Sequence, residues 1–156
     1  HNSVGIEISS MSMGQEPYSE RQINSLIELC QGIIERHHIP ARNVVGHSDI
    51  APTRKPDPGV AFPWQKLSEN GIGLWYDLND AVKVKESNQE ILLQKIGYNT
   101  ENLAAAMYAF CRHFIPQEVA INPDIHDLLQ HPYPEDFSLP EKYLPILQAC
   151  CERYNR

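Results

Sequence analysis

The sequence of 156 residues lacks a long apolar run, and basic residues are few in it. A membrane-spanning helix needs roughly 18 or more consecutive apolar residues, and no stretch approaches that length, so we expect no transmembrane segment in this chain. The 13 lysines and arginines are scattered and are outnumbered by 20 acidic residues, which leaves a formal net charge of -7. Because phosphate binding needs a concentrated basic surface, this composition argues against a nucleic-acid partner.

Cysteine is also scarce and does not occur at metal-binding spacing. The four cysteines are Cys30, Cys111, Cys150 and Cys151. None belongs to a CxxC pair, which argues against a zinc knuckle or a thioredoxin-like redox site. We therefore expect most of them to pack in the core. The neighbouring Cys150 and Cys151 leave the redox compartment open.

The first residues alternate between apolar and other side chains. Val4, Ile6 and Ile8 alternate with Gly5 and Glu7, and this period of two predicts a strand with one apolar face and with Glu7 on the opposite face. A single strand needs sheet partners, which the rest of this chain scarcely supplies. We therefore expect further sequence of the same protein upstream to complete a sheet.

A well-marked helix follows this segment. Ser19 and Gln22 have the spacing of a capping box at a helix start, and Pro40 predicts where the helix has ended. The apolar stripe between them predicts one buried face; its members are Ile23, Leu26, Ile27, Cys30, Ile33, Ile34 and His37. A short strand over 43–46 and a proline-rich loop over 48–64 are expected next.

After about residue 85 the composition changes to helical segments. The predicted helices span 90–96, 101–114 and 141–154. Ser138 and Glu141 are candidate caps of the last helix. The histidines of this part, which are His113, His126 and His131, have no paired ligands at suitable spacing. The chain is therefore predicted to form two domains, spanning residues 1–84 and 85–156, of which the second is a three-helix unit.

The candidate metal-binding residues are His47 and Asp57, in the run VVGHSDIAPTRKPDPG. His47 is expected at the end of the short strand, and neighbouring prolines stiffen the loop around Asp57. Zinc accepts imidazole nitrogen and carboxylate oxygen, and catalytic zinc sites use three protein ligands with water in the fourth position. Taken alone, this spacing favours a simpler interpretation, a strand-end histidine and a turn-capping aspartate. Trp64, Trp75 and Tyr76 flank the loop and are expected to pack rather than to bind sugar.

The run GHSDIAPTRKPDPGVAFPW closely resembles the second metal-binding loop of the type 2 N-acetylmuramoyl-L-alanine amidases, specifically the lipoprotein-type bacterial enzymes. The resemblance extends upstream to SVGIEIS and downstream through FPWQKLSENGIGLWYD, so it covers about residues 3–77. Farther on, ILLQKIGYNT and AMYAFCRHF resemble a peptidoglycan-binding helical domain. The implied fold is α/β: a mixed-sheet domain like that of amidases and peptidoglycan recognition proteins, incomplete at its N-terminus, followed by a small all-α three-helix domain.

The resemblance implies a role for four residues. His47 and Asp57 would be ligands of Zn2+, Glu7 would activate or orient the attacking water, and Lys55 would be a cation beside the reacting carbonyl. The family's third ligand, a histidine, is expected upstream of this chain. His1 is not expected to replace it, because His1 lies six residues from Glu7 on the same strand, about 20 Å away at full extension.

The implied activity is zinc-dependent hydrolysis of the amide bond between N-acetylmuramic acid and L-alanine of peptidoglycan stem peptides, in cell-wall degradation or recycling. The implied ligands are peptidoglycan or muropeptides, and the expected protein partner is the missing N-terminal segment of the same enzyme. A periplasmic or cell-envelope location follows from the lipoprotein-type resemblance. The alternative is a non-catalytic peptidoglycan-binding module of the same fold, and a third possibility is a structural fragment without a site of its own.

Overall fold

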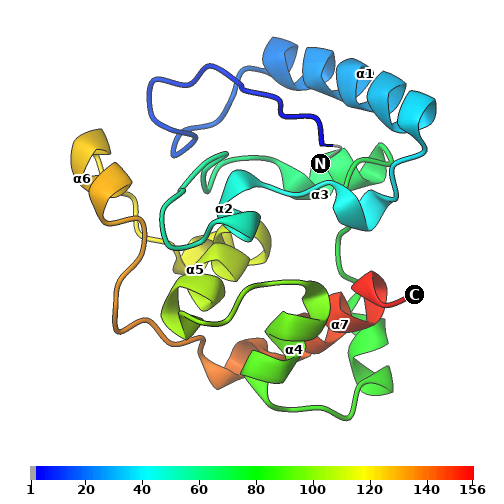
Figure 1. Cartoon of the computed structure of the whole chain (residues 1–156), viewed down its shortest axis with the longest axis vertical. Coiled ribbons are helices and arrows are strands. Elements are labelled where there is room, and N and C mark those ends of the chain that lie inside the picture. Colours follow the sequence, from blue (N-terminus) through cyan, green and yellow to red (C-terminus); the bar gives the residue numbers. More distant parts are fainter. Residues whose placement is uncertain (1–2) are drawn as a thin grey trace.

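The computed structural model describes residues 3–156. The helices are α1 (Glu20–His37), α2 (His47–Ile50), α3 (Trp64–Glu69), α4 (Gln89–Ile96), α5 (Leu103–Phe114), α6 (Ile125–Gln130) and α7 (Leu144–Tyr154). Short 3-10 helices span Ala41–Asn43 (η1), Leu78–Lys83 (η2), Pro116–Glu118 (η3) and Glu141–Tyr143 (η4). Figure 1 shows α1 along one side of the molecule and α4 and α7 at the opposite end, with α2 and α5 between them. Within the described part, no helix is both long and apolar enough to cross a bilayer.

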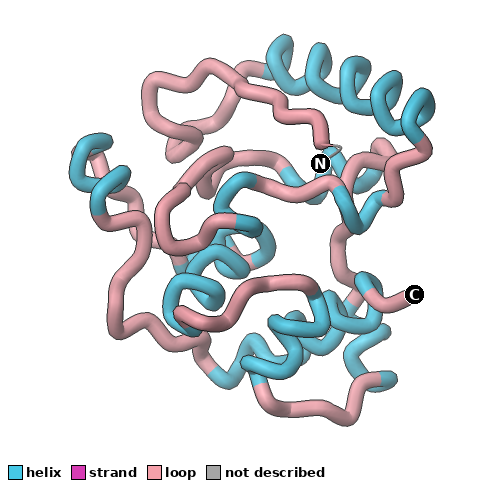
Figure 2. The backbone as a smooth tube through the Cα atoms, viewed as in Figure 1, coloured by secondary structure: helices cyan, strands magenta, loops and turns pink. Residues whose placement is uncertain are grey.

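The predicted mixed α/β sheet is wrong for this chain. Residues 3–156 contain helices, turns and loops but no strand, as Figure 2 shows. Val4 and Ile6 are 57% and 39% exposed, since no described segment pairs with them, and a strand requires a hydrogen-bonded neighbour. The strand expected over 43–46 is also absent: η1 ends there, and the chain turns into α2. His1 lies outside the described residues, so its exclusion as a ligand stays a prediction.

The predicted capping box and the end of α1 are confirmed. The Ser19 hydroxyl accepts a hydrogen bond from the Gln22 backbone N–H, and the Gln22 side chain accepts one from the Ser19 N–H. The helix ends at His37, before Pro40 as predicted, and His38 adopts a left-handed φ of 51° as its C-cap. Its apolar stripe packs against the segment around α3 to form the first core, made of Ile23, Leu26, Ile27, Cys30, Phe62, Trp64, Leu67 and Ile72.

The helices expected in the second half are present, at Gln89–Ile96, Leu103–Phe114 and Leu144–Tyr154, together with the unexpected α6. The proposed caps of the last helix are wrong, because α7 begins after Tyr143 without a side-chain cap, and Glu141 lies in η4. Pro145 falls in the first turn of α7, where its missing N–H leaves no hydrogen bond unmade. These helices enclose the second core, which includes Leu92, Leu93, Phe110, Phe114, Ile115, Leu139 and Leu147.

All four cysteines are free and buried, as expected for core residues. Three of them, Cys111, Cys150 and Cys151, belong to the second core and Cys30 belongs to the first. Burial raises the pKa of the Cys111 thiol to about 12 and also raises the pKa of Cys150. These side chains therefore stay protonated and act as small apolar groups.

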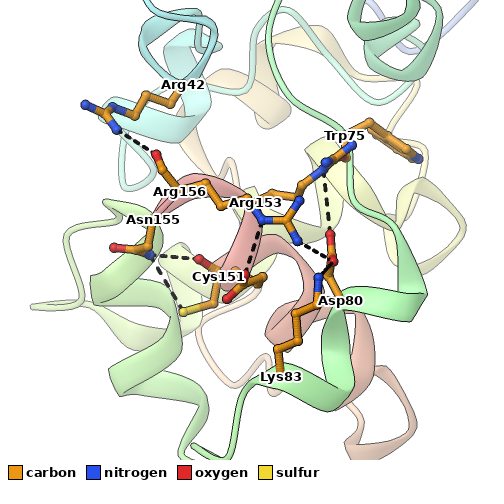
Figure 3. Close-up of polar contacts among 9 residues, drawn as sticks. Arg42, Trp75, Asp80, Lys83, Cys151, Arg153, Asn155 and Arg156 are labelled. Carbon is orange, nitrogen blue, oxygen red and sulfur yellow. Dashed lines mark hydrogen bonds and ion pairs between the residues drawn. The ribbon is translucent and has the colours of Figure 1, made fainter.

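The chain end is tied to the middle of the sequence through Asp80. Asp80 accepts hydrogen bonds from Lys83 and Arg156 and lies 3.9 Å from the Arg153 Nε (Figure 3). The hydrogen bond from Lys83, followed by the interaction with Arg156, holds the pKa of the Asp80 carboxyl below its usual value. The Arg42 guanidinium in turn donates to the Arg156 carbonyl oxygen at 3.4 Å. η2 thus packs against α7 and so belongs with residues 85–156, called the helical half below, although η2 itself precedes residue 85.

Candidate functional site

The structure brings His47 and Asp57 together. His47 is the first residue of α2 rather than the end of a strand, and Asp57 lies in the loop that follows. The Nδ1 atom of His47 is 3.0 Å from Oδ2 of Asp57, and the two side chains are 40% and 39% exposed. Two ligands of one tetrahedral zinc ion, each at about 2.1 Å, would stand roughly 3.4 Å apart. The pair therefore fits as two ligands of a single metal ion and is open to solvent.

A third protein ligand does not join this pair in the described part of the chain. Among residues 3–156, no group of three or more His, Cys, Asp or Glu side chains is placed to hold a metal ion. Zinc sites in enzymes use three protein ligands and one water. The pair therefore supplies part of a donor set, and the histidine expected from upstream stays a prediction.

The loop that carries Asp57 is held against the chain that precedes α1. The Ser48 N–H donates to the Asp57 carbonyl oxygen at 2.8 Å, and the Tyr18 hydroxyl donates to the Pro58 carbonyl oxygen at 2.7 Å. Gly59 has a φ of +89°, and a Cβ there would overlap the carbonyl oxygens of Met13 and its neighbour. The backbone at Gly59 thus packs directly against the backbone of Met13 and Gly14. This contact fixes the position of the loop relative to the segment before α1.

A buried polar network lies behind α2 and is centred on Asp49. Its Oδ2 accepts hydrogen bonds from the Gly46 N–H at 2.7 Å and from His113 Nδ1 at 2.8 Å. Its Oδ1 accepts one from the Tyr98 hydroxyl at 2.7 Å. Burial opposes ionisation of Asp49, but the interaction with His113 and the donors Tyr98 and Gly46 hold the pKa of this carboxyl below its usual value. Burial raises the Tyr98 pKa, so its hydroxyl remains a donor.

Helix α5 packs against α2. The His113 ring stacks on the indole of Trp64 with centroids 4.0 Å apart. The adjacent Arg112 is buried, donates to the Pro132 carbonyl oxygen and lies 5.1 Å from the Tyr108 ring centre. His113 therefore contacts the first half of the chain, at Trp64 and Asp49, whereas these contacts of Arg112 lie within residues 85–156.

The aromatic residues that flank the loop pack, as the sequence predicts. Trp64 is 6% exposed and belongs to the first core. Trp75 and Tyr76 stack with ring centres 5.0 Å apart, and Trp75 lies 5.5 Å from the Phe114 ring. These contacts place Trp75 against both cores.

Glu7 and Lys55 are not joined to the pair by any described hydrogen bond or ion pair. Glu7 is exposed in the segment before α1, and the hydrogen bond between His47 and Asp57 involves neither residue. Lys55 is half-buried in the same loop as Asp57, and its backbone N–H donates to the Ala51 carbonyl oxygen at 3.0 Å. The chemical roles of both residues therefore stay predictions.

Sequence reasoning missed the residues that support the pair from behind. His113 was set aside because no ligand stands near it in sequence, whereas its partner Asp49 lies 64 positions away. Tyr98 is 49 positions from the same carboxylate. The one available signal was an aspartate two residues after His47, in a run that is otherwise apolar or loop-forming.

The first part of the chain matches a known enzyme family. Residues 1–60 match the family described as N-acetylmuramoyl-L-alanine amidase (Amidase_2). The chain is 46% identical over 82 residues to N-acetylmuramoyl-L-alanine amidase AmiD of Escherichia coli, which is 48% of this chain and 30% of that protein. It is 44% identical over 65 residues to 1,6-anhydro-N-acetylmuramyl-L-alanine amidase AmpD of Enterobacter cloacae, which is 42% of this chain and 34% of the relative. The chain thus spans about a third of these relatives.

Two solved structures are similar over most of the chain. The complex of AmiD from E. coli with the substrate anhydro-N-acetylmuramic acid-L-Ala-D-gamma-Glu-L-Lys has a TM-score of 0.66 and 32% identity, covering 88% of this chain and 54% of that one. AmpDh3 from Pseudomonas aeruginosa has a TM-score of 0.67 and 30% identity, covering 90% of this chain and 56% of that one. Matches of this extent must reach well into residues 85–156, so they include much of the helical half.

Proposed function

Because the chain belongs to the type 2 N-acetylmuramoyl-L-alanine amidase family, we propose that the protein hydrolyses the amide bond between N-acetylmuramic acid and L-alanine of peptidoglycan stem peptides. His47 and Asp57 would hold a Zn2+ ion for this reaction. The observation that carries the proposal is their 3.0 Å separation, in a loop within the matched residues. The solved relative AmiD binds a substrate of this class.

The donor chemistry of the pair suits zinc. One imidazole nitrogen and one carboxylate oxygen lie 3.0 Å apart on partly exposed side chains, and both are ordinary zinc ligands. A bound zinc ion would act as a Lewis acid and lower the pKa of a water molecule towards ~7, which supplies a nucleophile for an otherwise inert amide. The third ligand would be the histidine predicted from outside the described residues.

Two further residues of this chain would move charge during the reaction. Glu7 would accept the proton of the attacking water and pass it to the leaving amine, which requires its carboxylate to come within about 3 Å of that water. Lys55 would stabilise the negative charge that grows on the former carbonyl oxygen. Its place two residues before Asp57, on a loop fixed by backbone contacts, supports this role.

The helical half would hold the enzyme on its polymer, and the reaction would take place in the periplasm or cell envelope. Tethering raises the effective concentration of the substrate without contributing to the chemistry. Substitutions on the exposed surface of residues 85–156 would then weaken activity on intact sacculi more than on soluble muropeptides. Equal loss on both substrates would contradict a tethering role.

The proposal is tested with a soluble anhydro-muropeptide, by following release of the stem peptide with zinc, with a chelator and after zinc is returned. The chain is assayed alone and mixed with the predicted upstream segment. We expect zinc-dependent cleavage, lost in His47→Ala and in Asp57→Ala, and retained binding without turnover in Glu7→Gln. Binding of the muropeptide without cleavage under every condition would favour the recognition-module alternative and would sink the hydrolase.

A further inference from the structure

Residues from both halves of the chain meet at Asp49. Asp49 is 8% exposed, His113 is 4% exposed and Tyr98 is 7% exposed, so the contact is shielded from solvent. Asp49 lies in α2, Tyr98 follows α4, and His113 lies in the last turn of α5. The carboxylate only accepts hydrogen bonds, so His113 Nδ1 must carry the hydrogen in this contact. Both oxygens of a buried carboxylate are thus satisfied, and most of the donors come from the helical half.

The same carboxylate binds the backbone N–H of Gly46, the residue that precedes His47. Its Oδ2 accepts the Gly46 N–H, and the Asp49 N–H donates back to the Gly46 carbonyl oxygen at 3.1 Å. Gly46 has no space for a side chain: a Cβ there would lie 2.9 Å from Pro58 Cδ and 3.1 Å from the Trp64 ring. The backbone just before His47 is therefore fixed by hydrogen bonds on one side and by close packing on the other.

A second link joins this backbone to Asp57. The Ser48 N–H, one residue after His47, donates to the Asp57 carbonyl oxygen at 2.8 Å. A displacement of α2 would stretch this bond and change the distance between the two candidate ligands. The position of α2 thus decides whether His47 and Asp57 face the same point.

We propose that His113, assisted by Tyr98, is a positioning residue for the metal pair. Through the Asp49 carboxylate it holds the backbone N–H of Gly46, the residue that precedes His47, and so sets the separation of His47 from Asp57. This inference rests on the proposed function only in taking His47 and Asp57 as metal ligands. The helical half then helps to position the metal ligands, in addition to its proposed role in binding the polymer.

The physical reason lies in the burial of the carboxylate. An ionised carboxylate away from water remains in place only while donors surround it. Without the His113 N–H, the Asp49 side chain would lose a donor on the oxygen that also receives Gly46. The carboxylate would then turn towards water and would draw the Gly46 peptide with it. Loss of Tyr98 would have a smaller effect, because its hydroxyl binds the other oxygen.

The matched variants are His113→Phe, His113→Asn and Leu147→Ala. Phe keeps a ring to stack on Trp64 but has no donor, whereas the Asn amide can donate from the place of Nδ1. Leu147 is fully buried in the second core, so its truncation weakens the helical half while leaving the Asp49 network intact. Each variant is assayed well below its own melting temperature.

The first measurement is amide hydrogen exchange at Gly46 and Ser48 in the full chain without metal. We expect protection at both amides to fall about 10-fold or more in His113→Phe, to recover in His113→Asn and to stay near wild type in Leu147→Ala. Equal loss in His113→Phe and Leu147→Ala, or no loss in His113→Phe, would overturn the proposal by showing a merely structural role.

The second measurement is the dissociation constant for Zn2+, by competition with a chelator, in the chain mixed with the predicted upstream segment that would supply the third ligand. We expect about a 10-fold weakening in His113→Phe, which is the lower end of the loss caused by removing a supporting partner of a metal ligand, and recovery in His113→Asn. Zinc affinity that is unchanged in His113→Phe would overturn the proposal. If wild type binds no zinc even with the upstream segment present, the proposed function fails, and the exchange measurement alone decides whether His113 positions α2.

Discussion

The two halves of the molecule differ in what holds them together. The helical half closes its own core with α4, α5 and α7, and η2 and the chain end are joined to it by charged contacts around Asp80. The first half has one long helix, a smaller core and extended loops. Yet the candidate metal pair lies in that less regular half, and its support comes from side chains of the helical half. The chemistry and the rigidity of this site thus come from different parts of the sequence.

Among the variants considered below, the largest effect is expected from the removal of Lys55, the proposed cation beside the reacting carbonyl. Lys55→Ala should lower kcat by about 100- to 1,000-fold, because one donor at a developing oxyanion is worth roughly 3 to 4 kcal/mol. The melting temperature should stay near wild type, since Lys55 is half-buried and its backbone hydrogen bond remains. Steady-state kinetics on a muropeptide and a thermal scan separate the two. A change in KM alone would place Lys55 in substrate binding.

A core truncation in the helical half should affect stability without specific loss of chemistry. Leu147→Ala is expected to lower the free energy of unfolding by about 2 to 5 kcal/mol, because Leu147 is fully buried and a cavity would remain. Denaturant unfolding measures the loss. Activity per folded molecule should be unchanged. A selective loss of activity at full folding would mean that the whole second core, rather than the Asp49 network, supports the site.

A side chain at the loop contact should disturb the first half in turn. Gly59→Ala places a Cβ at a φ of +89° and against the Met13 carbonyl oxygen. We expect a loss of roughly 1 to 3 kcal/mol in stability. We also expect weaker zinc binding, because the loop that carries Asp57 would have to move away from the backbone of Met13. Gly71→Ala is the matched control, since Gly71 has a φ of +77° but no atom within 4 Å of an added Cβ. Equal effects on zinc affinity in both variants would show that backbone strain, rather than the loop contact, is responsible.

The smallest effect is expected at the charged contacts of the chain end. The pKa of Asp80 is held below its ordinary value of 3.8. A lowered pKa contributes stability that is present above the ordinary value and is lost as the pH falls through the lowered one. Asp80→Asn should therefore reduce the melting temperature slightly at pH 7, and this difference should shrink as the pH falls below about 4. A difference that persists undiminished at pH 3 would contradict the assignment.

Local signals in the sequence predicted the helices well. The capping box of Ser19 and Gln22 and the apolar stripe of α1 depend on neighbours within a few residues and appear as expected, except that His37 at the end of the stripe is exposed. The sheet failed for the opposite reason. Period-two alternation at Val4, Ile6 and Ile8 states which face would be buried, but strand formation depends on a partner that residues 3–156 do not provide.

The candidate site divides in the same way. His47 and Asp57 are ten positions apart and their side chains lie 3.0 Å from each other; the spacing alone favoured a simpler interpretation, and their role as a metal pair comes from the resemblance. The contacts of Asp49 with Tyr98 and His113 span 49 and 64 positions, and periodicity or spacing carries no information on pairs so distant. Glu7 and Lys55 rest on the resemblance alone, and their roles stay predictions.

The central claim is that His47 and Asp57 bind one metal ion. Anomalous diffraction at the zinc edge, from crystals of the protein grown with Zn2+ and with the predicted upstream segment, tests it most directly. We predict a single strong peak about 2.1 Å from both His47 Nδ1 and an Asp57 carboxylate oxygen, absent from crystals of Asp57→Ala. A zinc peak bound elsewhere, with the His47–Asp57 pair joined only to each other, would contradict the account.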